Sequence, residues 1–145
     1  MNTVPTPDTP PPGFAPLENA TEGERFNGPF HIARDGGGVR LGFRVGARHL
    51  NAAGSVHGGV LALFADMLGY GIGVGSYSGA ANTITLAIDF LSPARNGDWV
   101  EAEPEITRET RSLIFFRAMM TVDGEPIAHC NGIYKKRTSP KEDPA

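Results

Sequence analysis

The apolar residues of the chain form one long block in the middle of the sequence, with shorter alternating runs on either side. The block HGGVLALFADMLGY, from His57 to about Tyr70, has the length and the leucine and alanine content of a helix. It is apolar nearly all round, which is typical of a helix buried in a core. Before it, PFHIARDGGGVRLGFRV predicts two strands joined by a hairpin turn at DGGG.

Further strand-like segments follow the predicted helix and provide the sheet that would cover it. They are NTITLAIDFLSP, DWVEAEPEITRET, SLIFFRAMMTV and PIAHCNGIYKK, with turns at PARNGD, ETRS and DGE. One long buried helix with long strands joined by tight turns predicts an α+β fold in which the sheet curls around the helix. We expect this domain to span 27–137, between a flexible proline-rich tail at 1–26 and a short tail at 138–145.

Composition and charge exclude several classes of partner. The 145 residues carry a formal net charge of -3, whereas nucleic acids and anionic membranes are bound by basic patches or stripes. No apolar segment reaches the ~20 residues that span a bilayer, and the N-terminus lacks the features of a signal peptide. The single cysteine, Cys130, cannot form an internal disulfide. We therefore expect a cytoplasmic protein that binds neither nucleic acid nor membranes.

Several familiar catalytic and binding motifs do not fit the sequence. The glycine-rich segment GYGIGVGSYSG follows the predicted helix, whereas the glycines of a nucleotide-binding loop lie between a strand and the next helix. There is no G-x-S-x-G nucleophile motif, and the four histidines show no metal-binding spacing, so no metal or cofactor is expected. Cys130 is predicted to be a small buried residue of an alternating strand, and His129 a polar surface residue on the opposite face.

The predicted helix begins with two glycines, which are poor helix formers. Each costs roughly 1 kcal/mol relative to alanine, so Gly58 and Gly59 suggest that another group approaches the backbone closely. Free N–H groups and the partial positive charge at a helix N-terminus suit a developing oxyanion. The segment from His57 to Gly59 is therefore predicted to bind an oxyanion. Glycines that allow tight packing of helix against sheet are the structural alternative.

Asp66 is the one charged residue in the apolar part of the helix. An isolated buried carboxylate is costly, so Asp66 must be hydrogen-bonded, face a polar cavity or carry a raised pKa. Each case is compatible with a general base or a nucleophile, and a structural aspartate satisfied by nearby hydroxyls is the alternative.

Helix geometry separates Gly58 from Asp66. Eight residues at 1.5 Å each place them roughly 12 Å apart along the axis, whereas groups acting on one carbonyl must lie within ~3 Å of it. If both are catalytic, two antiparallel copies of the helix must face each other across a symmetric interface. Each copy would then provide its glycine turn to one site and its aspartate to the other.

Three segments resemble the hotdog-fold acyl-CoA thioesterases of the phenylacetic acid degradation type, within the hydroxybenzoyl-CoA thioesterase superfamily. They are NAAGSVHGGVLALFADMLGYG, TITLAIDFLSPARNGDWVEAE and DGEPIAHCNG, and the resemblance covers about His31 to Lys136. It implies a curled antiparallel sheet wrapped around one long central helix, with the site between two subunits. It also implies hydrolysis of a medium-chain or aryl acyl-CoA without a cofactor, by a homodimer or homotetramer.

The resemblance also implies roles for individual residues. The Gly58 N–H would polarise the thioester carbonyl, with His57 shaping the turn. Asn51 would position the attacking water or the thioester. Asp66 of the partner subunit would activate water or attack directly. Thr83 stands where related enzymes have a serine hydroxyl near that acid, with packing as its structural alternative, as loop capping is for Asn51.

Substrate contacts and specificity are less clearly indicated. Gly59 belongs to the predicted oxyanion turn, and Arg95 and Arg111 match positions where relatives often carry a basic residue for the phosphates of coenzyme A. Gly71, Gly73 and Gly75 would either leave room for a bulky acyl group or allow close backbone packing. Two other functions stay open, namely a non-catalytic acyl-CoA-binding protein and an acyl-thioester dehydratase or hydratase, although the sequence motifs of the latter are absent.

Overall fold

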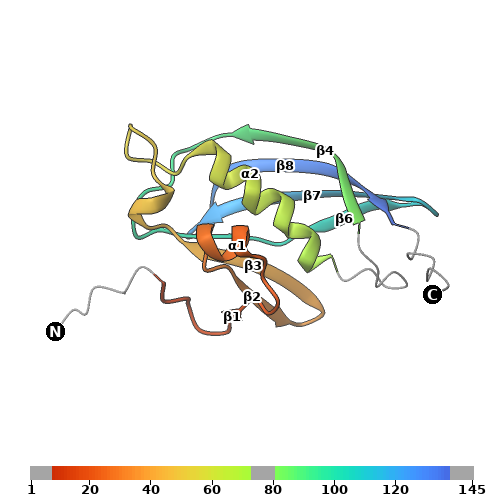
Figure 1. Cartoon of the computed structure of the whole chain (residues 1–145), viewed down its shortest axis with the longest axis horizontal. Helices are drawn as coiled ribbons and strands as arrows, with labels where there is room; N and C mark the ends of the chain where they lie inside the picture. The colour runs from red at the N-terminus through yellow and green to blue at the C-terminus, as the bar shows by residue number, and fades with distance from the viewer. Residues whose placement is uncertain (1–7, 73–80, 138–145) are drawn as a thin grey trace, which may run out of the picture.

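One antiparallel sheet and one main helix make up the fold (Figure 1). The computed structural model describes residues 8–72 and 81–137, so 1–7 and 138–145 of the expected tails lie outside it. The strands are β1 (Ala15–Pro16), β2 (His31–Asp35), β3 (Gly38–Arg44), β4 (Ala81–Phe90), β5 (Trp99–Ala102), β6 (Glu105–Glu109), β7 (Leu113–Val122) and β8 (Glu125–Lys136). The helical segments are α1 (Glu22–Asn27), α2 (Gly58–Met67) and the 3₁₀ turns η1 (Ala47–His49) and η2 (Leu68–Gly71).

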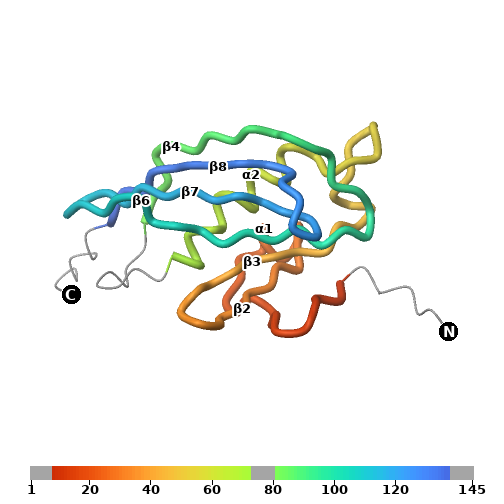
Figure 2. The backbone as a smooth tube through the Cα atoms, turned by 180° about the vertical axis from the view of Figure 1, so that it is seen from behind, coloured from red at the N-terminus to blue at the C-terminus, as the bar shows by residue number. Residues whose placement is uncertain are grey.

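The strands lie in the order β1-β2-β3-β5-β7-β8-β4, and β6 also pairs with β7. Seen from behind, β7, β8 and β4 run side by side along most of their length (Figure 2). The segment predicted as one strand from Asp98 to Thr110 is divided into β5 and β6, which pair with successive parts of β7. Pro104 lies at the break, because proline has no N–H to donate to the ladder. Among the described strands β4 pairs only with β8, so it forms an edge of the sheet.

Helix α2 lies against one face of the sheet (Figure 1). Its fully buried aromatic residue, Phe64, packs edge-on against Phe43 of β3 with 5.1 Å between ring centroids, and it stacks on Phe30 at 6.1 Å. These rings join β3 and the segment before β2 to the helix. The predicted α+β fold, a curled antiparallel sheet around one long helix, is confirmed, and the predicted helix corresponds to α2 and η2 together.

One face of α2 differs from the prediction of a helix buried all round. Gly59 and Asp66 are exposed, and Ala62 and Leu63 between them are only half-buried. The four positions share one face of a helix by their spacing of three and four residues. A single sheet covers only one side of a helix, so this face is open in the single chain.

The segment 8–26, expected to belong to a flexible tail, carries defined structure. Strand β1 pairs with β2, and Phe14 packs edge-on against Trp99 at 4.9 Å between ring centroids. Helix α1 begins with a capping box in which Thr21 and Glu24 each accept a hydrogen bond from the other's backbone N–H. The proline content alone gave no sign of this structure, which depends on the packing of Phe14 against Trp99 and of Leu17 against the core.

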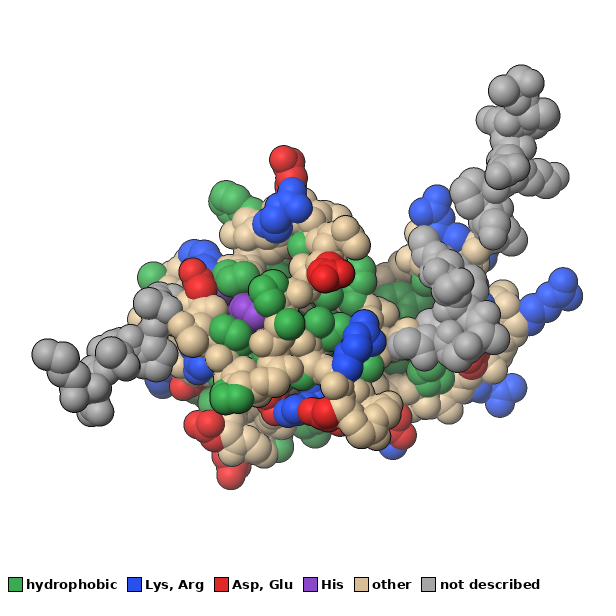
Figure 3. All heavy atoms as spheres, turned by 90° about the horizontal axis from the view of Figure 1, so that it is seen from below, with side chains coloured by type: hydrophobic (Ala, Val, Ile, Leu, Met, Phe, Trp, Pro, Cys, Tyr) green, Lys and Arg blue, Asp and Glu red, His purple; other side chains and the backbone are tan. Residues whose placement is uncertain are grey.

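Charges are mixed on the surface that Figure 3 shows, where lysine and arginine side chains are interspersed with aspartate and glutamate. None of the helices within 8–72 and 81–137 is long and apolar enough to cross a membrane.

Candidate active site

The start of α2 is fixed by the loop that precedes it. Two backbone hydrogen bonds hold this loop from opposite sides, from the Val56 N–H to the Ala94 oxygen and from the His57 N–H to the His49 oxygen, both 2.8 Å long. His49 is itself buried in the core. The first turn of α2 therefore stands at a defined position relative to the segment after β4.

His57 is the residue that caps α2. Its backbone is extended, and its Nδ1 accepts a hydrogen bond of 3.1 Å from the Gly59 N–H. The Gly58 N–H makes no hydrogen bond within the part of the chain that the structure describes. A free N–H at the positive end of a helix dipole can stabilise negative charge on an oxygen. Of the two glycines, Gly58 has this donor available, whereas that of Gly59 is occupied by the cap.

The ring of Phe90, at the end of β4, lies close to the α-carbon of Gly58. A side-chain Cβ at position 58 would stand 3.2 Å from Phe90 Cζ, which is tighter than an ordinary van der Waals contact. Glycine at this position therefore allows close packing of helix against strand. The same absence of a side chain leaves the backbone N–H accessible, so the structural and functional interpretations of Gly58 are compatible.

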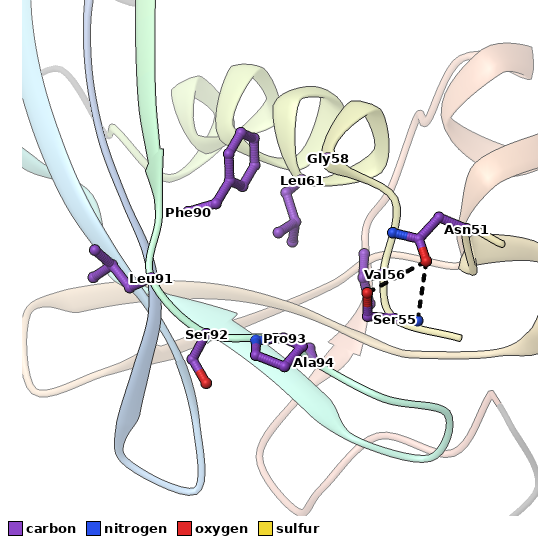
Figure 4. A pocket seen from close by; sticks show the side chains of 10 residues that line it. All are labelled: Asn51, Ser55, Val56, Gly58, Leu61, Phe90, Leu91, Ser92, Pro93 and Ala94. Atoms are coloured by element: carbon purple, nitrogen blue, oxygen red, sulfur yellow. Dashed lines mark hydrogen bonds between the residues drawn. The ribbon is translucent and has the colours of Figure 1, made fainter. Parts of the chain in front are cut away.

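A cavity of about 380 Å³ opens beside the start of α2 (Figure 4). None of its lining residues is charged, and most are apolar. They are Asn51, Ser55, Val56, Gly58, Leu61, Phe90, Leu91, Ser92, Pro93 and Ala94. Such a cavity suits an uncharged, largely apolar group whose polar atom meets the Gly58 N–H.

Asn51 closes the cavity on the side of the loop. Its Oδ1 accepts hydrogen bonds from the backbone N–H groups of Ala53 and Ser55, at 3.0 and 3.2 Å, and from the Ser55 hydroxyl at 3.3 Å. Asn51 therefore caps its own loop. Its amide nitrogen points toward the cavity in Figure 4 and makes no hydrogen bond within the described residues, so both of its N–H donors are left for a ligand.

Asp66 lies two turns further along α2, and its carboxylate is exposed. The Thr83 hydroxyl of β4 donates to Asp66 Oδ1 at 2.5 Å, and the Tyr134 hydroxyl of β8 donates to the Asp66 backbone oxygen at 2.9 Å. The β4–β8 register is irregular between Thr83 and Thr85, and such a bulge redirects side chains. The threonine suggested by the sequence thus meets the aspartate.

Within one chain Gly58 and Asp66 lie near opposite ends of helix α2. Helix α2 runs beside β4, with Gly58 next to Phe90 at one end of the strand and Asp66 bonded to Thr83 near the other. The helix separates the two groups by roughly 12 Å along its axis. Asp66 does not line the cavity at Gly58.

The two candidate arginines lie at opposite ends of the sheet. Arg95 follows Ala94 of the cavity wall, is exposed, and donates its backbone N–H to Asp98. Arg111 lies in the turn that connects β6 and β7 (Figure 1). The backbone oxygen of the next residue, Ser112, accepts a hydrogen bond from the Lys136 N–H at the end of β8. Only Arg95 is therefore near the Gly58 cavity of its own chain.

The glycines after α2 are described only in part. A Cβ at Gly71 would lie 2.6 Å from Leu41 Cδ1, so this glycine allows close packing and leaves no open space. Gly73 and Gly75 lie outside the described residues.

The other groups with reactive side chains are structural. Cys130 is fully buried, as predicted, and burial raises the pKa of its thiol to about 11. His129 lies opposite Asp89 at 3.4 Å on the other face of the sheet. Burial lowers the pKa of both His31 and His49. Within 8–72 and 81–137, histidine, cysteine and acidic side chains form no cluster that could hold a metal ion.

Two residues of this region were not found from the sequence. Phe90 and Tyr134 belong to predicted strands, and alternation marks Tyr134 as an inward position. Alternation predicts burial, but it does not say which helix residue a strand side chain will meet. Their contacts with Gly58 and Asp66 depend on how the strands pair.

A family model and a related protein both indicate the family of this chain. Residues 53–128 match the model of the thioesterase superfamily, which is more than half of the chain. A Pseudomonas aeruginosa protein provisionally named an esterase is 28% identical over 127 residues, covering 86% of this chain and 95% of that protein.

Solved structures share the fold. A variant of the phenylacetic acid degradation protein from Thermus thermophilus is 22% identical with a TM-score of 0.70, covering 81% of this chain and 100% of the other. A Streptococcus mutans protein bound to acetyl-CoA is 19% identical with a TM-score of 0.73, covering 86% and 98%. The chain belongs to the thioesterase superfamily and has its hotdog fold.

Proposed function

We propose that the protein is an acyl-CoA thioesterase that hydrolyses a medium-chain or aryl acyl-CoA to the free acid and coenzyme A. The observation that carries the proposal is the free N–H of Gly58 at the start of α2, a residue that lines an uncharged cavity of about 380 Å³. The similar Streptococcus mutans protein binds acetyl-CoA, which supports an acyl-CoA as the ligand here.

Hydrolysis of a thioester requires stabilisation of the oxyanion that forms on the carbonyl oxygen. The Gly58 N–H and the helix dipole would supply it, and removal of such a donor commonly costs ~100-fold or more in rate. His57 fixes this turn by capping it, and the Asn51 amide nitrogen is available to position the water or the thioester.

The second catalytic group is proposed to come from a partner subunit. Strand β4 is an edge with exposed apolar side chains, since Ile84 and Phe90 are 53% and 59% exposed, and Leu91 directly after the strand is 55% exposed. Long apolar edges pair readily with another chain. An antiparallel pairing of β4 with a second β4 would set the two α2 helices antiparallel, with their open faces available to each other.

This pairing would bring the Asp66 end of one helix to the Gly58 end of the other. Within each chain Gly58 stands at the Phe90 end of β4 and Asp66 at the Thr83 end. A two-fold axis near the middle of β4 exchanges these ends. The dimer would then hold two identical sites, and a tetramer would hold two such dimers.

In each site the partner's Asp66 would activate a water molecule or attack the carbonyl carbon directly. With water, the carboxylate accepts a proton, a C–O bond forms, and the C–S bond breaks as the sulfur leaves and takes up a proton. In a direct attack the carboxylate oxygen bonds to the carbonyl carbon, the C–S bond breaks as coenzyme A leaves and its sulfur takes up a proton, and water then hydrolyses the mixed anhydride to the free acid and the carboxylate. Thr83 orients the carboxylate in both cases.

The remaining candidate residues are assigned to substrate binding. Gly59 completes the turn without a side chain, and Arg95 stands beside the cavity wall, where it can meet a phosphate of coenzyme A. Arg111 lies at the other end of the sheet, so we propose that it contacts coenzyme A in the partner's site.

Release of free thiol from a panel of acyl-CoA substrates tests the proposal. Purified protein should hydrolyse at least one medium-chain or aromatic thioester without added metal or nucleotide. Binding of acyl-CoA without thiol release, on short, medium, long and aromatic substrates, would instead identify a non-catalytic binding protein. Hydration of an enoyl thioester without thiol release would identify a hydratase.

A further inference from the structure

Asp66 accepts two hydrogen bonds from one pair of neighbouring residues on adjacent strands. The Thr83 hydroxyl donates to its carboxylate at 2.5 Å, and the Tyr134 hydroxyl donates to its backbone oxygen at 2.9 Å. Thr83 and Tyr134 are direct partners in the β4–β8 register. The side chain and the backbone of Asp66 are therefore both anchored to the same pair of neighbouring strand residues.

Tyr134 is itself rigidly held. Its side chain is buried, with the residue 5% exposed, and its ring stacks on Phe116 with 4.9 Å between centroids and 9° between planes. Burial, together with the nearby Asp66, raises the pKa of Tyr134, so its hydroxyl stays protonated and remains a donor. A fixed donor of this kind defines the position of the carbonyl that it binds.

The helix changes from α-helical to 3₁₀ geometry next to Asp66, where the Tyr134 hydroxyl contacts it. Helix α2 ends at Met67 and continues as the 3₁₀ turn η2, and Gly69 lies beside the Tyr134 hydroxyl. A Cβ at Gly69 would stand 3.0 Å from the Tyr134 oxygen, which is tighter than nine in ten real Cβ contacts, so the hydroxyl would have to shift by a few tenths of an ångström. The absence of a side chain at Gly69 therefore lets the hydroxyl reach the Asp66 carbonyl at the helix end.

We propose that Tyr134 is a positioning residue for Asp66, a role that rests on the proposed thioesterase function. Its hydroxyl fixes where the Asp66 backbone stands along the helix, and Thr83 fixes the direction of the carboxylate. The carboxylate is exposed on the open face of α2 and must meet a substrate bound against another chain. Small errors in its position would therefore act directly on the chemical step, since a displacement of 1 Å can cost ~100-fold in rate.

The test is Tyr134→Phe, which removes one hydroxyl and keeps the ring that stacks on Phe116. We expect kcat to fall ~10-fold with KM within about twofold of wild type, because the loss concerns the orientation of a catalytic group. Thr110→Val is the matched control. It removes a hydroxyl that binds the Leu113 N–H at 3.0 Å in the β6–β7 turn, and its kcat should be unchanged.

A double-mutant cycle separates positioning from a merely structural role. Tyr134→Phe is made again in an Asp66→Asn background and assayed at enzyme concentrations high enough to measure a much slower enzyme. If Tyr134 acts through the carboxylate, the second change alters the residual rate less than about twofold. Equal losses in both backgrounds, or no loss of kcat in the single variant, would overturn the proposal.

A second variant covers the case in which Tyr134→Phe does not fold, which thermal melting would reveal. Gly69→Ala leaves Tyr134 in place and displaces its hydroxyl from the Asp66 carbonyl, so it should give the same loss of kcat with KM preserved. Wild-type kcat in a folded Gly69→Ala variant would contradict the role. A wild-type protein without thiol release refutes the proposed function, whereas an active protein with an Asp66 effect and no Tyr134 or Gly69 effect refutes only this inference.

Discussion

The two ends of helix α2 differ in chemistry. At the Gly58 end a backbone N–H is free, the neighbouring cavity has no charged lining residue, and Phe90 packs against the glycine. At the Asp66 end an exposed carboxylate accepts a hydrogen bond from Thr83 of β4, and the Asp66 backbone oxygen accepts one from Tyr134 of β8. One end can stabilise negative charge and the other can accept a proton, yet one helix keeps them roughly 12 Å apart. In the mechanism that we propose, a single chain thus holds two incomplete and complementary parts of a hydrolytic site.

Removal of the charge at the Asp66 end should have the largest effect. Asp66→Asn keeps an oxygen that can accept from Thr83, so folding should persist, but the general base or nucleophile is lost. We expect kcat to fall by ~100-fold or more, measured by thiol release. Asp89→Asn is the control, since Asp89 lies on the other face of the sheet beside His129. Turnover of Asp66→Asn close to that of wild type would assign Asp66 a structural role.

The hydrogen bond from Thr83 should matter less than the charge it orients. Thr83→Val keeps the shape of the side chain and removes the donor to Asp66 Oδ1. Hydrogen bonds to charged groups are worth about 1.5–3 kcal/mol, and Thr83 is exposed in the single chain, so we expect a loss of kcat of about 5- to 10-fold. Restoration of wild-type kcat by Thr83→Ser would confirm that the hydroxyl is responsible. A Thr83→Val enzyme with full kcat would show that the bond is not used.

At the Gly58 end the side chain should matter less than the backbone. His57→Ala removes the cap of the Gly59 N–H but leaves the Gly58 N–H in place. We expect kcat to fall only a few-fold, and stability to fall by on the order of 0.5–1 kcal/mol, the usual value of an N-cap. Kinetics and chemical denaturation of the same variant separate the two effects. A loss of kcat as large as that of Asp66→Asn would mean that the His57 side chain itself takes part in the chemistry.

The smallest effect is the pH dependence of stability, which concerns the loop before the Gly58 end of α2. His49 holds the loop before α2, with its Nδ1 accepting from the Gly46 N–H at 2.9 Å, and burial lowers its pKa below the ordinary value of 6.5. The unfolded chain therefore takes up protons first as pH falls, so stability is full above pH 6.5 and is lost as the pH drops below it toward the folded pKa.

Urea denaturation at pH 7.5 and 5.5 measures this loss. We expect the free energy of unfolding to fall by on the order of 1 kcal/mol in wild type, and by less in His49→Gln, which cannot titrate. The buried His31, whose pKa is also lowered, should contribute the remainder. An identical pH dependence in His49→Gln would show that His49 does not carry the effect.

The sequence predicted much of the fold, because the helix and most strands carry strong local patterns. The block from His57 to Tyr70 corresponds to α2 and η2, and the DGGG and DGE segments form the expected turns, with positive φ at Gly36, Gly37 and Gly124. The segment 8–26 was missed because its structure depends on contacts with Trp99 and β2, which lie far away in the sequence.

The site was predictable only in part, for a physical reason. The apolar sequence of α2 predicts that the helix is buried. It does not distinguish burial under the chain's own sheet from burial against another chain. The open face with Asp66 and the exposed edge of β4 therefore appeared only with the structure. The proximity of Thr83 to Asp66 came from family resemblance, while the contact of Tyr134 and the remote position of Arg111 depend on strand register.

The most direct test of the shared site is complementation between two inactive variants. Asp66→Ala removes the carboxylate, and Gly58→Val blocks the turn against Phe90, so each should be inactive as a homodimer. If Gly58 of one chain works with Asp66 of the other, a mixed dimer contains one intact site and one doubly damaged site. Random exchange makes about half of the dimers mixed, so roughly a quarter of wild-type thiol release should return. Verified subunit exchange without any recovery would contradict a site shared between subunits.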